Sequence, residues 1–310
     1  MKKVTLLING NLVPFYSATL NYSVEQLAHT FSADIPPMSI TSPLPVEFRL
    51  DDVSILIGQI DDTDSSTESS AHKISITGRS KSANMIDSRI TMDALYDQNV
   101  AKLLASIAKP FGLSVQSRVG TMPVIPEFQI NAESPVENIA QIIREQGYML
   151  IERNGVLSIE NTAHETVQGV GLQVGKNIES LGIKRTFNKQ FHHTEVQGAW
   201  DGSYAVTSNP NINKQRVMVI ICDQLQNAEA CLSRAKYERN LAIAESLTAS
   251  STIANVFQEL AIDGLNRIIR VMDESQDFNE MLVIKALSLE VSKTSASTSI
   301  ELFRPFKEQK

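Results

Sequence analysis

Turn signals recur throughout the first ninety residues and leave room only for short strands between them. Asn9-Gly10 separates the apolar run Val4–Ile8 from Leu12–Phe15, and Asp51-Asp52 lies between two further apolar runs. A two-residue Asn-Gly connection is typical of a tight hairpin turn. Many short strands joined by such turns are typical of a barrel or a sandwich. We therefore expect the first third of the chain to be built from strands.

The stretch that ends this third reads ITGRSKSANMIDS and covers residues 76–88. Before it we expect a polar loop from Asp61 to Ser70 and a strand over His72–Thr77. We interpret Gly78 as a bend that ends the strand. A short helix over Ala83–Asp87 should follow and lead into the next part of the chain.

The middle of the chain carries helical signals. Apolar residues within Gln98–Lys109 recur at helical spacing, and Pro110 and Gly112 end the pattern. Ser134-Pro135 is a strong helix start, with a capping serine before proline at the first position. Asn154-Gly155 predicts a hairpin after that helix. These features predict a small α+β module.

After about residue 166 the chain is again rich in predicted strands. One long helix from Gln226 to about Glu245 interrupts them. Further strands are expected over Ile178–Phe187, Thr194–Trp200, Arg216–Cys222, Leu247–Val256, Ile268–Met272, Met281–Ser292 and Ser297–Phe303. The predicted fold class is therefore α+β and β-rich.

Composition and charge narrow the range of functions that this chain can have. The chain of 310 residues has a net charge of −7, which argues against a general DNA-binding surface but fits a passage that DNA crosses without binding. No apolar stretch approaches the roughly 20 residues of a membrane helix, and the apolar run after Lys3 is too short for a signal peptide. We expect synthesis and assembly in the cytoplasm. Cys222 and Cys231 lack metal-ligand spacing and are expected to be reduced, partly buried thiols.

Residues 76–88 also resemble an active site at first sight. A phosphate-binding loop needs glycine before its lysine, but Ser80 precedes Lys81. An esterase nucleophile elbow needs a second glycine where Ser82 stands. Ser233 and Lys236 match a serine–lysine spacing, but they lie inside the predicted long helix. No nucleophile, base and oxyanion site assembles, so we predict no enzyme activity, no catalytic residue and no cofactor.

The sequence gives little support for a metal site. An EF-hand loop within Asp61–Glu68 would need glycine where Thr67 stands and glutamate where Lys73 stands. An irregular cation site in this acidic stretch stays open beside the simpler reading of a solvated loop. His192 and His193 are adjacent and point to opposite faces of a strand, so they do not readily share one metal.

Four segments, taken in order, resemble the baseplate hub proteins of Mu-like contractile-tailed phages and prophages, the 43 kDa tail proteins. They are VTLLINGNLVPFYSATLNYSVEQLAHTFSADIP from Val4, ITGRSKSANMIDS from Ile76, FQINAESPVENIAQIIREQGYMLIERNGVLSIEN from Phe128 and CDQLQNAEACLSRAKYERNLAIAESLT from Cys222. The second segment keeps the family's Gly78, Arg79 and Asp87. It departs from the family at Ser80, Asn84 and Ser88.

The resemblance implies a structural role. Members of this family form a trimeric ring in which each subunit has two similar β-barrel tube domains, giving pseudo-sixfold symmetry. Such a homotrimer joins the six-fold tail tube to the three-fold tail spike and leaves a lumen for DNA. The implied partners are further copies of the chain, the tail spike protein, the tail tube and other baseplate proteins. The implied location is the baseplate of the virion tail.

The resemblance and the predicted elements together give three domains. We expect a first tube domain at 1–92, the α+β module at 93–165, and a second tube domain with the long helix at 166–310. Gly78, Arg79 and Asp87 form a structural junction between the first two, and we expect Arg79 and Asp87 to fix it by hydrogen bonds or charge pairing.

An alternative is a tail-associated module that binds or hydrolyses peptidoglycan. Hydrolysis would need paired carboxylates in a cleft. Glu133 and Glu137 are available, but both lie at a predicted helix start, where capping explains them.

Overall fold

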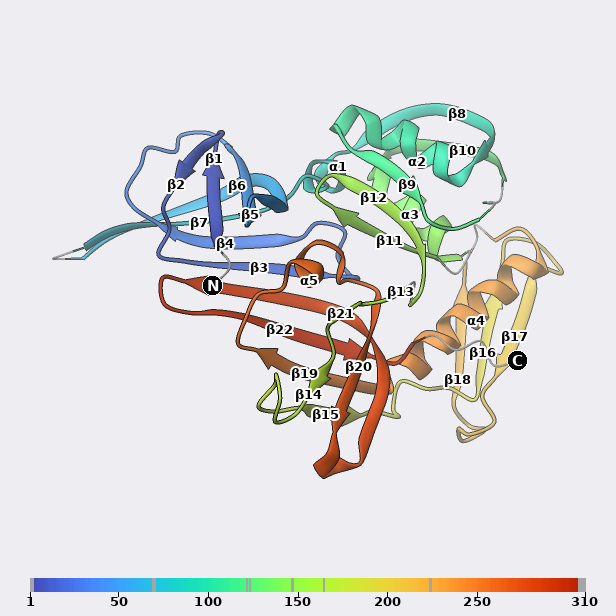
Figure 1. The fold of residues 1–310 in the computed structure, drawn as a ribbon. Coiled ribbons are helices and arrows are strands. Elements are labelled where there is room, and N and C mark those ends of the chain that lie inside the picture. Colours follow the sequence, from blue (N-terminus) through green and yellow to red (C-terminus); the bar gives the residue numbers. More distant parts are fainter. Residues whose placement is uncertain are drawn as a thin grey trace.

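The computed structural model describes residues 3–68, 71–120, 122, 124–145, 148–163, 165–222 and 225–305. Strands dominate these residues, with three α-helices between residues 83 and 145 and two more between residues 228 and 263 (Figure 1). The β-rich α+β class predicted from the sequence is therefore confirmed.

A fourteen-stranded sheet contains most of the first and last thirds of the chain, in the order β15-β19-β22-β21-β3-β4-β7-β6-β5-β1-β2, with β20 beside β21 and the short β13 and β14 beside β20. The first third contributes β1 Val4–Ile8, β2 Asn11–Val13, β3 Ser17–Ser23, β4 Thr30–Ile35, β5 Pro45–Leu50, β6 Val53–Glu68 and β7 Ala71–Ser80. The last third contributes β13 Glu165–Thr166, β14 Leu172–Gln173, β15 Gly182–Arg185, β19 Leu247–Ile253, β20 Arg267–Asp273, β21 Phe278–Ser292 and β22 Ala296–Phe303, with α5 Gln258–Asp263 and the 3-10 turn Glu274–Gln276.

The two thirds meet where β3 pairs with β21. The register runs from Ala286 opposite Ser23 to Ser292 opposite Ser17. One hydrophobic core lies beneath this pairing and takes residues from both thirds, among them Leu20, Phe31, Phe48, Leu287 and Ile300. No pairing between described strands closes either third into a barrel, because the strand order has open ends.

Two expectations about the first third were wrong. Residues 61–68 are not a loop, because β6 continues through them and pairs with β7 as far as Glu68 opposite Ala71. Residues 62–66 of β6 are exposed to solvent, so their polar side chains do not prevent strand pairing. Gly78 is not a bend either: it lies inside β7, between Ile60 on β6 and Phe31 on β4.

The middle module has a core of its own. It consists of α1 Ala83–Asp87, β8 Ile90–Asn99, α2 Val100–Ala108, the 3-10 turn Lys109–Phe111, β9 Ser114–Ser117, β10 Val124–Glu133, α3 Pro135–Glu145, β11 Tyr148–Arg153 and β12 Val156–Asn161. The Asn99 side chain accepts a hydrogen bond from the Ala101 amide and so caps α2. Gly112 stops the turn after α2 with φ of 69°, which glycine adopts without strain. The predicted helices and the β11–β12 hairpin are confirmed, whereas β8 and β10 were not predicted.

A separate three-stranded sheet stands beside α4, which spans Ala228–Ala244. Its strands are β16 His193–Gln197, β17 Tyr204–Ser208 and β18 Val217–Ile221. One face packs on α4 through Val196, Cys222, Cys231 and Ala235. Neither Cys222 nor Cys231 forms a disulfide, as expected for reduced thiols, and both are buried rather than partly buried. The predicted strand Ile178–Phe187 is only the four residues of β15.

The close approach around Gly78 gives a stability prediction. A Cβ at residue 78 would overlap with the Gln59 carbonyl oxygen and the Phe31 ring. We expect Gly78→Ala to lower the free energy of unfolding by about 1–3 kcal/mol, because the backbone of β6 cannot move without breaking the sheet. Urea denaturation measures the change. Gly120→Ala is the matched control, since a Cβ there meets nothing within 4 Å. Equal stability of the two variants would contradict the tight packing.

Candidate functional site: a polar sheet face and the junction beside it

One face of the large sheet is lined with small polar side chains, and we call it the polar face. One row of paired residues crosses seven strands in register, in the order Thr252, Ser299, Ser288, Asn21, Thr30, Arg79, Gln59. The next row reads Ser297, Glu290, Thr19, Ser32, Thr77, Asp62. Side chains alternate between the two faces of a strand, so the residues between these point into the core. The polar face therefore extends without interruption across both β-rich thirds.

Hydrogen bonds between neighbouring strands hold these side chains in place. The Ser288 hydroxyl donates to Asn21 Oδ1 at 2.7 Å, and the Asn21 amide nitrogen donates to Thr30 Oγ1 at 3.4 Å. Thr252 and Ser299 share a hydrogen bond of 3.1 Å. Such cross-strand pairs stabilise a sheet by a few tenths of a kcal/mol each. They also satisfy polar groups that would otherwise bind a ligand.

The charges on the polar face are mostly acidic. Asp62, Asp64, Glu290 and Glu301 are exposed on it. Two of its basic groups are engaged in ion pairs: Lys73 Nζ lies 3.1 Å from Asp34, and Arg79 binds two carboxylates. Lys184 lies opposite Thr248 on the edge strand β15 and is exposed on this face. A hydrogen bond from Ser75, together with Lys73, lowers the pKa of the Asp34 carboxyl. Such a surface repels the phosphates of a nucleic acid.

Arg79 joins the sheet to the middle module at one end of the polar face. Its Nε donates to Asp61 at 2.6 Å, and its terminal nitrogens donate to the two oxygens of Asp87 at 2.7 and 3.1 Å. Asp61 is the extra residue of a bulge in β6, which turns its side chain toward Arg79. Arg79 lowers the pKa of Asp87, and both carboxylates raise the pKa of Arg79. Arg79 and Asp87 thus lie in direct contact, while the part played by Asp61 was not predicted.

The role of this ion pair at the junction stays a prediction. Arg79→Ala removes a partner from both carboxylates, whereas Asp87→Ala leaves the bond to Asp61. We expect Asp87→Ala to cost less than about 1 kcal/mol of unfolding free energy, as for exposed pairs, and Arg79→Ala about 1–2 kcal/mol. Denaturation at low and high salt measures both.

Arg89→Ala is the matched control for these variants, because Arg89 donates to the Ile86 and Ser88 carbonyls at 3.4 and 3.3 Å and acts on Asp87 through its charge, outside the Arg79 hydrogen bonds. If all three variants match the parent protein in stability, residues 76–88 are merely a connector.

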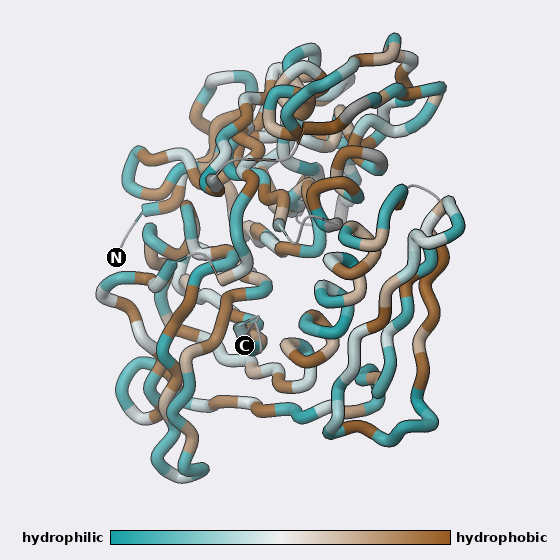
Figure 2. Tube along the Cα trace, turned by 90° about the vertical axis from the view of Figure 1, so that its right-hand side faces the viewer, coloured by the Kyte–Doolittle hydropathy of each residue, from teal (hydrophilic) through white to brown (hydrophobic). Residues whose placement is uncertain are grey.

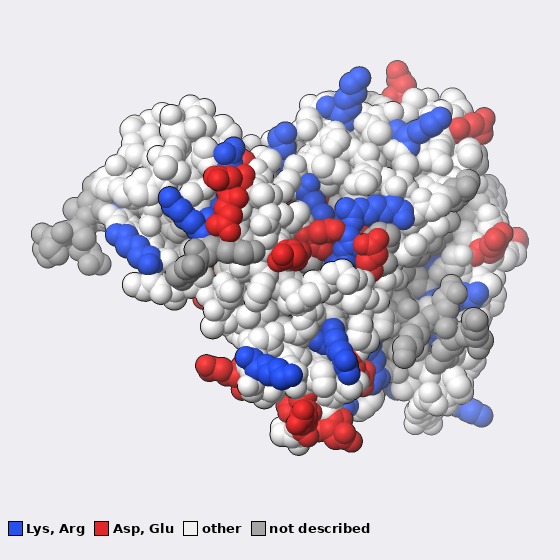
Figure 3. All heavy atoms as spheres, in the orientation of Figure 1, with Lys and Arg blue, Asp and Glu red and all other residues white. Residues whose placement is uncertain are grey.

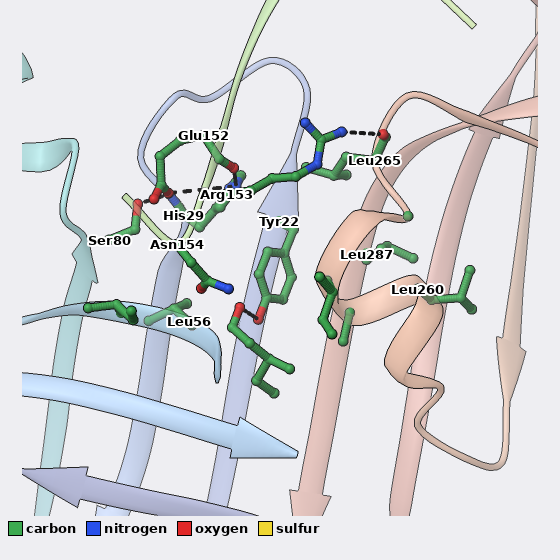
Figure 4. Close-up of a pocket in the computed structure, with 15 residues that line it drawn as sticks. Tyr22, His29, Leu56, Ser80, Glu152, Arg153, Asn154, Leu260, Leu265 and Leu287 are labelled. Atoms are coloured by element: carbon green, nitrogen blue, oxygen red, sulfur yellow. Dashed lines mark hydrogen bonds and ion pairs between the residues drawn. The ribbon is translucent and has the colours of Figure 1, made fainter. Parts of the chain in front are cut away.

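A buried polar cluster lies behind this junction, where the β11–β12 hairpin enters between the two β-rich thirds (Figure 4). His29 Nε2 lies 2.7 Å from the Glu152 main-chain oxygen, so Nε2 carries the proton and donates it. The Ser80 hydroxyl accepts from the His29 amide at 3.0 Å, and the Asn154 side chain donates to the Ser54 carbonyl at 2.8 Å. These bonds attach the hairpin to the first third of the chain.

Burial governs the charge of this cluster. It lowers the pKa of His29 to about 4 and raises the pKa of the Glu152 carboxyl, against hydrogen bonds from Gly155 and Ser80. His29 Nδ1 and Glu152 Oε2 have no hydrogen-bond partner among the described atoms. The enclosed cavity beside them measures only about 10 Å³, which is no larger than one water molecule needs. This cluster is a packed structural contact and has no room for a substrate.

The raised pKa of Glu152 gives a pH prediction. The folded chain holds this proton more tightly than the unfolded chain, so stability falls as pH rises from 4.5 through the folded pKa. Glu152→Gln removes this loss, which amounts to about 1.4 kcal/mol per unit of pKa shift. We expect the variant to gain stability relative to the parent between pH 4.5 and 8, measured by urea denaturation. A difference that does not change with pH would contradict a raised pKa for the buried Glu152 carboxyl.

A second charged cluster ties the same hairpin to the last third. Arg153 donates to Glu160 at 2.6 Å and to the Leu265 carbonyl at 3.0 Å, and its Nε lies 2.7 Å from Asp263. Arg118 and Arg267 also contact Asp263. Figure 3 shows blue and red side chains gathered over the region where α5 meets the hairpin. The hairpin therefore holds all three parts of the described chain together.

The other sequence motifs do not assemble into a site. Ser80 and Ser82 are buried, and Ser82 donates to the Leu27 carbonyl at 3.0 Å. The described residues contain no group of three or more histidine, cysteine or acidic side chains placed to hold a metal. The side chains of Thr67 and Glu68 lie outside this description. Glu133 ends β10 and Glu137 lies in the first turn of α3, and both are exposed to solvent rather than enclosed in an apolar cleft.

Among the described helices, none combines the length and the apolar character needed to cross a bilayer.

Comparison with known proteins agrees with the fold. No family profile matches the chain. The baseplate hub protein gp44 of Escherichia phage Mu is 22% identical over 278 residues, which cover 81% of this chain and 73% of gp44. The 43 kDa tail protein of prophage MuSo2 from Shewanella oneidensis superposes with a TM-score of 0.85 at 20% identity, covering 98% of both chains. The tail protein of Neisseria meningitidis MC58 gives 0.84 at 14% identity over 98% of this chain and 96% of that one.

These proteins are named for tail and baseplate structure and not for a catalytic activity. The chain thus has the fold of phage tail proteins over nearly its whole length, and its predicted resemblance to the baseplate hub proteins of Mu-like phages and prophages is confirmed.

Proposed function

We propose that the chain is the baseplate hub of a Mu-like contractile tail, a homotrimeric ring whose lumen is lined by the polar face. The observation that carries this proposal is the continuity of the polar face across β3 and β21. Three copies of a sheet that presents one polar face enclose a passage lined throughout by hydroxyl and carboxylate groups. Closed rotational symmetry limits the assembly to a ring.

Two tube domains per subunit would suit a tail in which a six-fold tube meets a three-fold spike. We place them at 1–92 and 166–310, with the α+β module at 93–165 between them, and propose that both close into barrels within the ring. Residues 83–92 of the first range form the connection and pack on the core of the module. Six similar units then face the six-fold tail tube on one side, while the three subunits match the three-fold tail spike on the other. The pairing of β3 with β21 fixes the two units of one subunit side by side, which supports this arrangement.

The chemistry of the polar face supports DNA passage without binding. Its basic groups Lys73 and Arg79 are neutralised by neighbouring carboxylates, and Asp62, Asp64, Glu290 and Glu301 outnumber the exposed Lys184 at its β15 edge. DNA binding depends on free lysine and arginine side chains that replace counterions on phosphates. The proposed partners are therefore other copies of the chain, the spike and the tube, in a hub that is assembled in the host cytoplasm, carries no cofactor and performs no catalysis.

The ring makes a direct prediction about mass. Light scattering at micromolar concentration should give about three times the 34.2 kDa of one chain. A species that stays monomeric over that range would contradict the proposal.

Lysines on the polar face should convert the lumen into a DNA-binding channel. We expect the triple variant Ser32→Lys, Thr77→Lys and Ser288→Lys to bind linear duplex DNA in a mobility-shift assay, whereas the parent protein does not. The affinity should fall steeply as salt rises, because each lysine displaces counterions. Closed circular DNA should not bind to a preformed ring, since it has no end to thread.

A control variant places three lysines at exposed positions of the middle module, Ala105, Ser106 and Gln116. If the lumen variant binds circular and linear DNA equally, or if this control binds linear DNA as well as the lumen variant does, the polar face does not line a closed passage.

A further inference from the structure

The three-stranded sheet of β16, β17 and β18 has one face that nothing covers. Figure 2 shows α4 on one side of this sheet and no other described segment on the opposite side. The uncovered face carries Val217, Val219 and Ile221 from β18, of which Ile221 is 72% exposed. Tyr204 adds its ring from β17, where it pairs through Gln197 with Ile221. Large apolar side chains gathered on one small surface typically mark an interaction site.

β18 also has a free edge, because β16 is its one partner in the described sheet. In a parallel pair, alternate residues of a strand bond to the neighbour. The His193 amide donates to the Arg216 carbonyl at 3.3 Å, and the Cys222 amide donates to the Gln197 carbonyl at 2.8 Å. The even-numbered residues 216–222 thus bond to β16. The amide and carbonyl groups of Val217, Val219 and Ile221 point away from the sheet.

The edges of the large sheet are protected in ways that β18 is not. β15 carries the exposed cations Lys184 and Arg185, and β2 has only three residues. Charges and short lengths of this kind keep edge strands from pairing with other chains. β18 reads VMVII, with no charge, proline or bulge and with high strand propensity. An unprotected apolar edge of this kind is suited to receive another strand.

The size of the surface decides between possible occupants. Three strands of five residues each cover roughly 16 by 14 Å, on the order of 200 Å². The middle strand adds the polar side chains of His193, Glu195 and Gln197 to this face, so its apolar part lies along the β18 edge. A stable dimer needs about 800 Å² from each partner, so this face alone does not sustain a dimer of two copies. An extended segment of a partner instead gains main-chain hydrogen bonds along the edge and uses the apolar face for its side chains.

We propose that the free edge of β18 binds an extended segment of a partner protein as a fourth strand, with apolar side chains at alternate positions packed on Val217, Val219 and Ile221. Trp200, the chain's one tryptophan, is 68% exposed in the turn that joins β16 to β17 of this sheet. It therefore reports binding by fluorescence. The proposal concerns a surface outside the large sheet and does not depend on the ring.

The test uses a capped peptide that alternates valine and threonine over seven residues, with a lysine at each end for solubility. We expect a saturable blue shift of Trp200 emission and slower amide exchange at Val219 and Ile221, whereas Met218 and Ile220 are already protected. The same peptide with its central valine replaced by proline should bind at least tenfold more weakly. Absence of saturation at millimolar peptide would overturn the proposal.

Variants of the edge sharpen the test. Val219→Pro removes a donor that points to the free edge and keeps the ladder with β16, so peptide affinity should fall at least tenfold while the melting temperature changes little. Val53→Pro, at another exposed strand position, is the control and should leave binding unchanged. Equal binding by Val219→Pro, or slow exchange at Val219 in the assembled protein without peptide, would show that no partner strand adds here. The mass of the assembly is measured on the same variant, so failure of the ring and failure of this site are separate results.

Discussion

The pairing of β3 with β21 is the constraint on which the rest of the structure depends. It joins residues 17–23 to residues 286–292, so more than 260 residues lie between the partners. Closing so long a segment costs conformational entropy, which burial of Leu20 and Leu289 on the core side offsets. The same register aligns Asn21 with Ser288 on the opposite side. The hydrogen bonds between β3 and β21 thus make both the hydrophobic core and the polar face continuous across the first and last thirds of the chain.

Local sequence signals predicted the elements whose residues decide their own conformation. Val4–Ile8 alternates and ends at Asn9-Gly10, and the helix at Pro135 begins with a capping pattern, so both appear as expected. β8 and β10 lack comparable turn residues and were not predicted. The outer half of β6 is polar and was taken for a loop, since its pairing comes from β7 rather than from burial. The pairing of β3 with β21 has no local signal at all. The resemblance to the tail proteins rests on the order of several motifs along the chain, and it indicated an overall architecture that hydrophobic periodicity does not encode.

The contacts of the candidate site also divide into those that follow from the local sequence and those that depend on the tertiary fold. Arg79 and Asp87 are eight residues apart on a strand and the helix after it, so their contact follows from the local chain path. Asp61 reaches Arg79 only through a bulge in the neighbouring strand, and His29 meets Glu152 across 123 positions. A glutamate inside the apolar strand Tyr148–Arg153 was the available signal for that buried contact. Which histidine would face it depends on the tertiary fold.

Two open sheet surfaces of this chain have opposite chemistry. The polar face bears hydroxyl groups that already bond to one another, and its cations Lys73 and Arg79 are neutralised, so contact with another molecule gains little energy. The face of β18 bears valine and isoleucine beside unpaired main-chain groups, so covering it releases water from apolar surface and satisfies donors and acceptors. In the proposed hub, the passage must not bind what moves through it, whereas the outer surfaces must bind their partners. Separating these properties on two sheets would let one subunit meet both requirements, because a change that strengthens the proposed contact at β18 leaves the polar face unaltered.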